Sequence, residues 1–163
     1  MLTKLLSAAT CATCQKCCIF ESYDIWNTPV LLPEDRKKAS IFLPDAEFIS
    51  ISTEAWKFRI DLKEQQEEFQ CPLLDPDKGC LLGEEKPFDC QIWPFRLTEL
   101  EGRQAITMAS YCEAMAAHSL QTLLAFLKAG AGDQMFAYAE QHPAVIHPYD
   151  DLYPVLLWKP LKF

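Results

Sequence analysis

Clustered cysteines are the residues of this chain whose type and spacing could do chemistry. Four of the eight cysteines fall within eight residues, as C-x2-C-x2-C-C: Cys11, Cys14, Cys17 and Cys18. Two intervening residues let the chain turn back, so that both thiolates of a C-x2-C pair can reach one metal ion. The doubled spacing therefore predicts a metal-binding loop over residues 11–18 rather than four unrelated thiols.

Four further cysteines follow at long range: Cys71, Cys80, Cys90 and Cys112. Between the first two, Asp75–Gly79 combines proline and glycine in a pattern typical of a turn, so a hairpin could bring Cys71 and Cys80 close together. Cys112 is predicted in the first turn of a helix, on its inward face, where a ligand and a packed core thiol are equally good interpretations.

Two metal chemistries fit eight sulfurs. The C-x2-C-x2-C spacing matches the first three ligands of the bacterial ferredoxin run, which predicts an iron–sulfur cluster of the [4Fe–4S] type with a fourth, remote cysteine. Two zinc sites of four cysteines each also fit, because thiolates bind both metals. We favour iron–sulfur over zinc. Adjacent residues tend to point apart, so Cys17 and Cys18 suggest either two nearby centres or one ligand beside a free, reactive thiol.

No other motif competes with the cysteines. Five glycines leave no G-x-G-x-x-G loop, and no activated nucleophile stands out, so catalytic residues stay unknown. The three histidines are interpreted as non-ligands, and two of them precede proline in a polar loop, where surface histidines are ordinary: His118, His142 and His147.

Length and composition predict one folded domain over residues 1–163. Half of the 163 residues are hydrophobic, which provides for a core and argues against disorder. The net charge of −8 argues against nucleic acid or an anionic membrane surface as the main partner. No run is long enough to span a membrane, and the apolar stretch Leu5–Ala9 is too short for a secretory signal. We therefore expect a cytoplasmic protein with reduced thiols.

The patterning predicts an α+β fold with small antiparallel sheets, metal-ligand loops and a C-terminal helix pair. The expected elements are a helix over Pro33–Ala39, strands over 47–52 and 56–62, strands over 95–100 and 104–109, a helix from Ser110 to Gly130, and a helix over 133–141. The aromatic tail over 148–163 is expected to pack over the core or over an opening and to carry no chemistry.

The three cysteine blocks resemble the YkgJ family, a cysteine-cluster family with a CxxCxxCC signature that is described as a zinc- or iron-chelating domain. The blocks are residues 11–18, then Cys71–Pro72 with Cys80, then Lys86–Pro87-x2-Cys90-x3-Pro94. The resemblance covers about residues 11–112 and leaves 113–163 as a helical and aromatic tail. It implies metal binding and a basic residue that orients an acidic group near the cluster. This chain departs from the family by lacking a glycine in the first block and by having Lys86 where arginine is common.

All eight cysteines are candidate ligands, and three functions follow. The first is an iron–sulfur protein in redox or modification chemistry with a protein partner or substrate that the sequence does not identify. The second is a zinc-binding structural or interaction module without catalysis, and the third is a metal-handling protein for storage or transfer. Whether the chain is an enzyme stays open. In each case metal binding would be part of folding.

Overall fold

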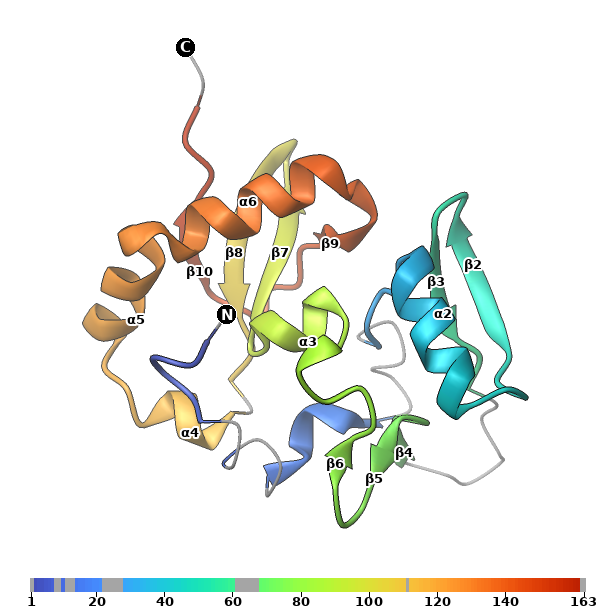
Figure 1. Ribbon diagram of the computed structural model, residues 1–163. Helices are drawn as coiled ribbons and strands as arrows, with labels where there is room; N and C mark the ends of the chain where they lie inside the picture. Colours follow the sequence, from blue (N-terminus) through green and yellow to red (C-terminus); the bar gives the residue numbers. More distant parts are fainter. Residues whose placement is uncertain are drawn as a thin grey trace. The chain divides into compact units, whose positions relative to one another are not determined.

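The computed structural model describes residues 2–7, 10, 14–21, 28–60, 68–110 and 112–161. The chain divides into two compact units (Figure 1). The cysteine unit is Ser7–Gln91, and the sheet unit is Ile92–Phe163 together with Met1–Leu6. The α+β class is confirmed, because small antiparallel sheets and helices are combined. That the chain forms a single domain stays a prediction.

The cysteine unit contains short elements joined by loops. Its helices are η1 (Lys16–Cys18), α2 (Pro33–Phe42), η3 (Gly83–Glu85) and the start of α3 (Phe88–Ile92). Its strands are β1 (Ile19–Glu21), β2 (Phe48–Ser52), β3 (Ala55–Phe58), β4 (Glu68–Gln70), β5 (Leu74–Asp75) and β6 (Gly79–Cys80). They form three two-stranded antiparallel sheets, β1–β4, β2–β3 and β5–β6.

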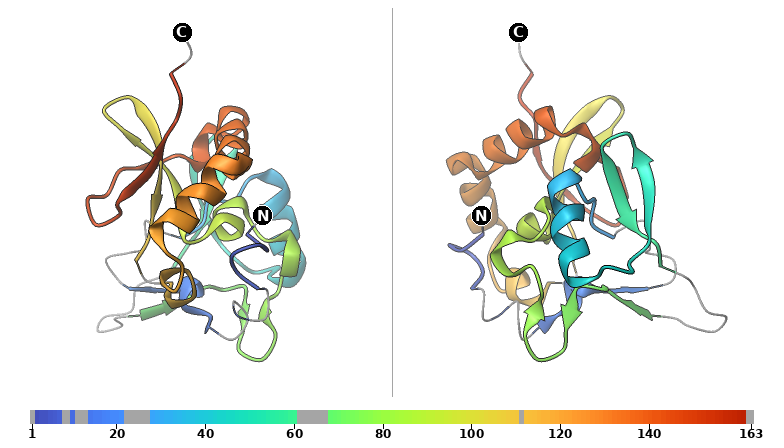
Figure 2. Two further views of the ribbon diagram at one scale, coloured as in Figure 1. Left: turned by 90° about the vertical axis from the view of Figure 1, so that its left-hand side faces the viewer. Right: turned by 45° about the vertical axis from the view of Figure 1, so that its right-hand side comes forward.

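Helix α2 begins where the sequence predicted it and runs three residues further. Pro33 occupies the first turn, and the Asp35 carboxylate accepts the N–H of Leu32 at 3.0 Å, which satisfies one free amide of the helix start. The helix lies beside the β2–β3 hairpin (Figure 2), where the Arg36 guanidinium stacks 5.2 Å from the Phe48 ring centroid and 4.8 Å from that of Trp56. The predicted hairpin is confirmed over these strands, and residues 61–62 lie outside the described residues.

Cysteines take part in the core of the cysteine unit. Its buried cluster consists of Phe20, Leu31, Ala39, Phe58, Cys71, Leu73, Leu74 and Leu82, and Cys18 and Cys80 pack against it. Because interiors are close-packed, the positions of these sulfurs depend on the surrounding apolar side chains.

The sheet unit has a four-stranded sheet in the order β10-β8-β7-β9. The strands are β7 (Phe95–Leu100), β8 (Arg103–Met108), β9 (His147–Pro148) and β10 (Val155–Trp158), and only the β7–β9 pair is parallel. The helices are α4 (Glu113–Ala116), α5 (Leu120–Phe126), the π-helical η4 (Leu127–Ala131), α6 (Gly132–Gln141) and η5 (Pro143–Val145).

Helix α6 covers one face of this sheet (Figures 1 and 2). A Cβ atom at Gly132 would lie 2.6 Å from Leu157 Cδ2 and 3.5 Å from Ile106 Cδ1, so glycine permits the close approach of helix and strands. The predicted β7–β8 hairpin is confirmed, with Glu101 and Gly102 at φ 52° and 75° in its turn. The predicted helix over 133–141 is also confirmed, as α6.

The long helix predicted from Ser110 to Gly130 is wrong. Cys112 is the N-cap of the four-residue α4, and Ser119 then takes an extended backbone, accepting the N–H of Thr122 on its hydroxyl at 3.1 Å to start α5. A serine that caps a new helix explains the break. Gly130, at φ 111° within η4, then marks a kink between α5 and α6.

The tail packs on the core through buried side chains such as Tyr153, as expected, and it also supplies strand β10 and the end of β9 to the sheet. His147, expected at the surface, is buried beside Thr98 in the β7–β9 register. No helix within the described residues is both long and apolar enough to cross a membrane.

Candidate metal centre

The first cysteine block is attached to the β5–β6 hairpin of the second block. Gln15 adopts a left-handed backbone, with φ 53° and ψ 0°, which turns the chain into η1 with Cys17 and Cys18. Its side-chain amide donates to the carbonyl of Pro76 at 3.0 Å, in the β5–β6 turn. Cys14, the residue before Gln15, is exposed, and Cys11 lies outside the described residues.

Main-chain pairing brings Cys71 to Cys18. Strands β1 and β4 pair Ile19 with Gln70, and the next step of the same ladder is the N–H of Cys71 donating to the carbonyl of Cys18 at 2.7 Å. The first and second cysteine blocks are therefore neighbours through their backbones, whatever their side chains bind.

The predicted turn after Cys71 is confirmed and places Cys80 in the adjoining hairpin. The Asp75 carboxylate accepts the N–H groups of Asp77 and Lys78, both at 2.9 Å, and these bonds lower the pKa of Asp75. Gly79 then takes φ 80°, and Cys80 pairs with Leu74 across the hairpin. The turn chemistry of this segment thus holds Cys80 near the strand that follows Cys71.

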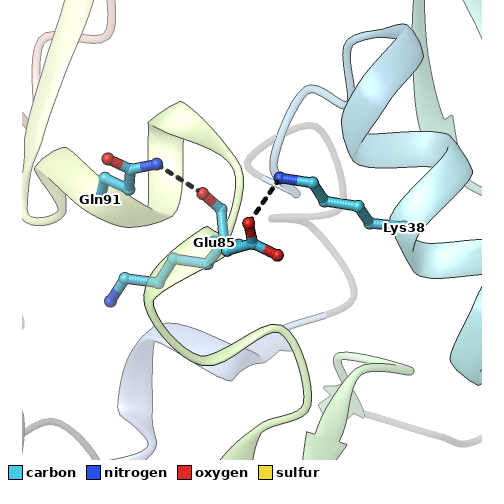
Figure 3. Close-up of polar contacts among 4 residues, drawn as sticks. Lys38, Glu85 and Gln91 are labelled. Carbon is cyan, nitrogen blue, oxygen red and sulfur yellow. Dashed lines mark hydrogen bonds and ion pairs between the residues drawn. The ribbon is translucent and has the colours of Figure 1, made fainter.

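The third block is held by polar contacts around α3, the helix that carries Cys90. The Asp89 carboxylate accepts the N–H of Val30 at 2.9 Å, and the Gln91 side chain donates to the Lys86 carbonyl at 2.7 Å. Glu85 forms an ion pair with Lys38 of α2 at 3.4 Å, and Figure 3 shows these last two contacts side by side. The segment before Cys90 is therefore tied both to its own helix and to α2.

Cys17 and Cys18 form an asymmetric thiol pair. Their sulfurs are 3.8 Å apart. A hydrogen bond from the Cys18 thiol and the positive charge of Lys86 lower the pKa of Cys17 to about 7, although burial opposes them. The same bond, burial and the negative charges of neighbouring cysteines raise the pKa of Cys18. Cys17 is thus the thiol of this pair that ionises near neutral pH, and the thiolate is the form that binds metal.

The cysteines of the later blocks interact with this pair. Burial raises the pKa of Cys71 to about 11, and negative charge on Cys80 and Cys17 adds to the effect. Burial also raises the pKa of Cys90, as do negative charges on Cys71, Asp89, Cys17 and Cys80. Thiols that shift one another in this way lie near each other. We call the five the thiol group: Cys17, Cys18, Cys71, Cys80 and Cys90.

The structure thus gathers five of the eight candidate ligands in the cysteine unit. Cys112, the buried N-cap of α4, belongs to the sheet unit, so its predicted burial near a helix start is confirmed. Among the described residues, no three His, Cys, Asp or Glu side chains already converge closely enough to hold a metal ion. For the described thiols alone to hold a metal, they would therefore have to move closer together.

Sequence reasoning missed two residues that position the thiol group. Nothing in the sequence indicates that Gln15 takes a left-handed backbone or reaches Pro76. Asp89 gave a weak signal, as an acid in the first turn after a proline, but its bond to Val30 depends on distant pairing. Lys86 places its charge where it favours the Cys17 thiolate, and its expected role in orienting an acidic group stays a prediction.

Comparison with known proteins identifies the family. Residues 10–113 match the family model "CxxCxxCC: putative zinc- or iron-chelating domain", which covers most of the chain. The chain belongs to this family, and the match supports metal binding by its cysteines. No curated protein and no solved structure matches the chain.

Proposed function

We propose that the thiol group binds an iron–sulfur cluster that serves redox or modification chemistry with a partner protein or substrate. The observation that carries the proposal is the gathering of five thiols, from three separate blocks, whose charges act on one another. Cys11 and Cys14 complete the C-x2-C-x2-C spacing that an iron–sulfur cluster uses.

The donor set fits such a cofactor. Sulfur ligands are soft and favour iron–sulfur clusters and zinc over magnesium or calcium. Cys17 is poised to ionise, and the buried thiols would lose their protons on binding, since a metal cation offsets the cost of buried negative charge. A bound cluster would supply one-electron chemistry, while these residues hold it and limit its exposure to water.

Structural zinc is the second candidate, and the burial of the thiols supports it. Cys71 is part of the apolar core, and Cys18 and Cys80 pack against that core. Closed sites of this kind stabilise small folds without catalysis. A metal carrier would use the same thiols, but it would release its metal to a competing chelator.

The deciding experiment measures iron, acid-labile sulfide and zinc on protein purified without oxygen, with an absorption spectrum of the same sample. A brown protein with iron and sulfide in near-equal amounts supports the cluster, and a colourless protein with zinc supports the structural module. A folded, reduced protein with neither metal refutes both. Cys17→Ser should lose most of the metal, and Cys112→Ser tests whether the sheet unit supplies a ligand.

A further inference from the structure

Strand β2 has an outer edge that no described residue covers. The N–H of Arg59 donates to the carbonyl of Glu47 at 2.9 Å, so that pair is hydrogen-bonded. Because bonded and non-bonded pairs alternate in an antiparallel ladder, the Phe48–Phe58 and Ser50–Trp56 pairs are non-bonded ones. The N–H and C=O groups of Phe48 and Ser50 therefore point away from β3.

Strand β3 gives an independent check of this register. Trp56 exchanges both of its backbone bonds with Leu31, at 2.7 and 2.9 Å, on the side of β3 opposite to β2. A residue bonded on that side has no backbone group left for Ser50, as the alternation requires. Within the part of the chain that the structure describes, no backbone hydrogen bond reaches the outward groups of Phe48 or Ser50.

Apolar side chains lie next to this open edge. Phe48 packs on Phe58, with ring centroids 5.2 Å apart, so the Phe48 face of β2 is the one that meets α2. Ile49 lies on the opposite face, and Ile51 lies at the irregularity between Ser50 and Ser52; each exposes 46% of its surface. An unpaired edge that carries exposed isoleucines and no charged residue is a template for another strand.

We propose that an extended segment of a partner protein, basic at both ends, adds to β2 as a further strand. Strand addition would use the outward backbone groups of Phe48 and Ser50 for affinity, and alternate apolar side chains would pack on Ile49 and Ile51. This docking site is independent of the metal and goes beyond the proposed function.

The charges around β2 favour a basic partner over a second copy of this chain. Exposed acids lie at both ends of the strand, Asp45 and Glu47 before it and Glu54 after it, and among the described residues Glu47 forms an ion pair with Arg59 at 3.2 Å. Two β2 strands paired antiparallel about Ser50 would bring Glu47 of one copy beside the Glu54 turn of the other. Parallel pairing would set each acid against itself. Like charges across a strand pair are destabilising, so both arrangements are disfavoured.

The test uses the full-length, metal-loaded protein and a fluorescent peptide in which valine alternates with threonine and each end carries two basic residues. We expect saturable binding by fluorescence anisotropy. A peptide with the same core and acidic ends should bind at least roughly tenfold more weakly, since tenfold corresponds to about 1.4 kcal/mol. Absence of saturation by about 1 mM peptide, the weak limit of specific binding, overturns the proposal.

Two substitutions at Ser50 separate strand addition from adhesion to apolar side chains. Ser50→Pro removes an outward N–H but no β2–β3 bond, so the hairpin should persist while peptide affinity falls by roughly tenfold or more. Ser50→Ala should bind like the wild type, and matching circular dichroism spectra show that both variants fold. Equal peptide binding by the two variants overturns the proposal. A wild-type dimer that Ser50→Pro abolishes also overturns it, because the edge of β2 would then pair with a second copy of this chain.

Discussion

Asp89 should stabilise the cysteine unit through a part-buried hydrogen bond to a buried backbone donor. Its carboxylate accepts the N–H of Val30 at 2.9 Å, and Val30 exposes 2% of its surface while Leu31 exposes none. In Asp89→Ala this N–H would have no acceptor inside the fold, which costs about 1–3 kcal/mol. Loss of an acid from the first turn of α3 adds roughly 0.3–1 kcal/mol. We therefore expect the free energy of unfolding to fall by about 2–3 kcal/mol.

The matched control is Asp89→Asn, which keeps an oxygen acceptor and removes the charge. A neutral acceptor is weaker, so this variant should lose only about 1 kcal/mol. Urea unfolding of the reduced apo protein, followed by far-ultraviolet circular dichroism, compares the two variants with the wild type. If the two variants lose equal free energy of unfolding, or if Asp89→Ala loses less than about 0.5 kcal/mol, the reasoning about a buried donor at Val30 is refuted.

A second measurement separates the charge of Asp89 from its hydrogen bond. After burial and the charge on Cys71, the negative charge of Asp89 raises the pKa of Cys90. Both variants remove that charge, so both should lower the pKa of Cys90 and speed its alkylation at alkaline pH. If the alkylation rate of Cys90 changes in Asp89→Ala but not in Asp89→Asn, local unfolding rather than the loss of charge explains the result.

Three further predictions concern the cysteine unit. Lys86→Met should raise the pKa of Cys17 above its value of about 7 and slow its alkylation by iodoacetamide at neutral pH, as mass spectrometry can follow, while Lys86→Arg retains the wild-type rate. The folded pKa of Cys17 lies below the reference value of 9.0, so the free energy of unfolding of the apo protein should rise between about pH 7 and 9 and fall as the pH drops through 7. If Cys17→Ser keeps this rise, Cys17 is not the group that causes it. Gln15→Gly and Gln15→Ala both lose the bond to Pro76, but only glycine relieves the left-handed backbone, so urea unfolding should find Gln15→Gly more stable by about 1 kcal/mol. Identical stabilities would show that φ 53° costs nothing here.

The parts of the fold that were predicted from sequence depend on local chemistry. The Asp75–Gly79 turn, the Glu101–Gly102 hairpin and the start of α2 at Pro33 each follow from residues within a few positions of one another. Proline, glycine and capping carboxylates act on their own backbone, so the sequence carries this information directly.

The parts that were missed depend on competition or on distance. Ser110 and Ser119 are both reasonable helix caps, and only the packed structure decides that Ser119 starts a helix. The pairing of β1 with β4 joins segments far apart in the sequence, and neither strand has a clear alternating pattern. Strand β10 is short and follows a proline, so its place beside β8 is set by the sheet rather than by its own residues.

For the candidate site, the sequence indicated which cysteines could act and the fold indicates which of them are neighbours. Spacing singled out residues 11–18 and left Cys112 as either a ligand or a core thiol, whereas backbone pairing brings Cys71 to Cys18 and hairpin register places Cys80 opposite Leu74. Cys112 could not be separated from these by spacing, because membership of a compact unit depends on the whole contact pattern.

The backbone contacts also suggest what metal removal would disturb. Among the described residues, the first two cysteine blocks are linked by main-chain bonds and by the Gln15 side chain, contacts that do not involve the thiols. The bond to Cys17 and burial raise the pKa of Cys18, and burial raises that of Cys71; within the described residues no three candidate ligands converge, so the side chains and the η1 turn are the parts that a metal would reorganise. It follows that hydrogen exchange on metal removal should rise most at η1, less at the β1–β4 ladder, and least in β7 and β8, which have a core of their own. Uniform loss of protection across all of these strands would mean that the metal holds the whole chain together rather than one loop against a preformed ladder.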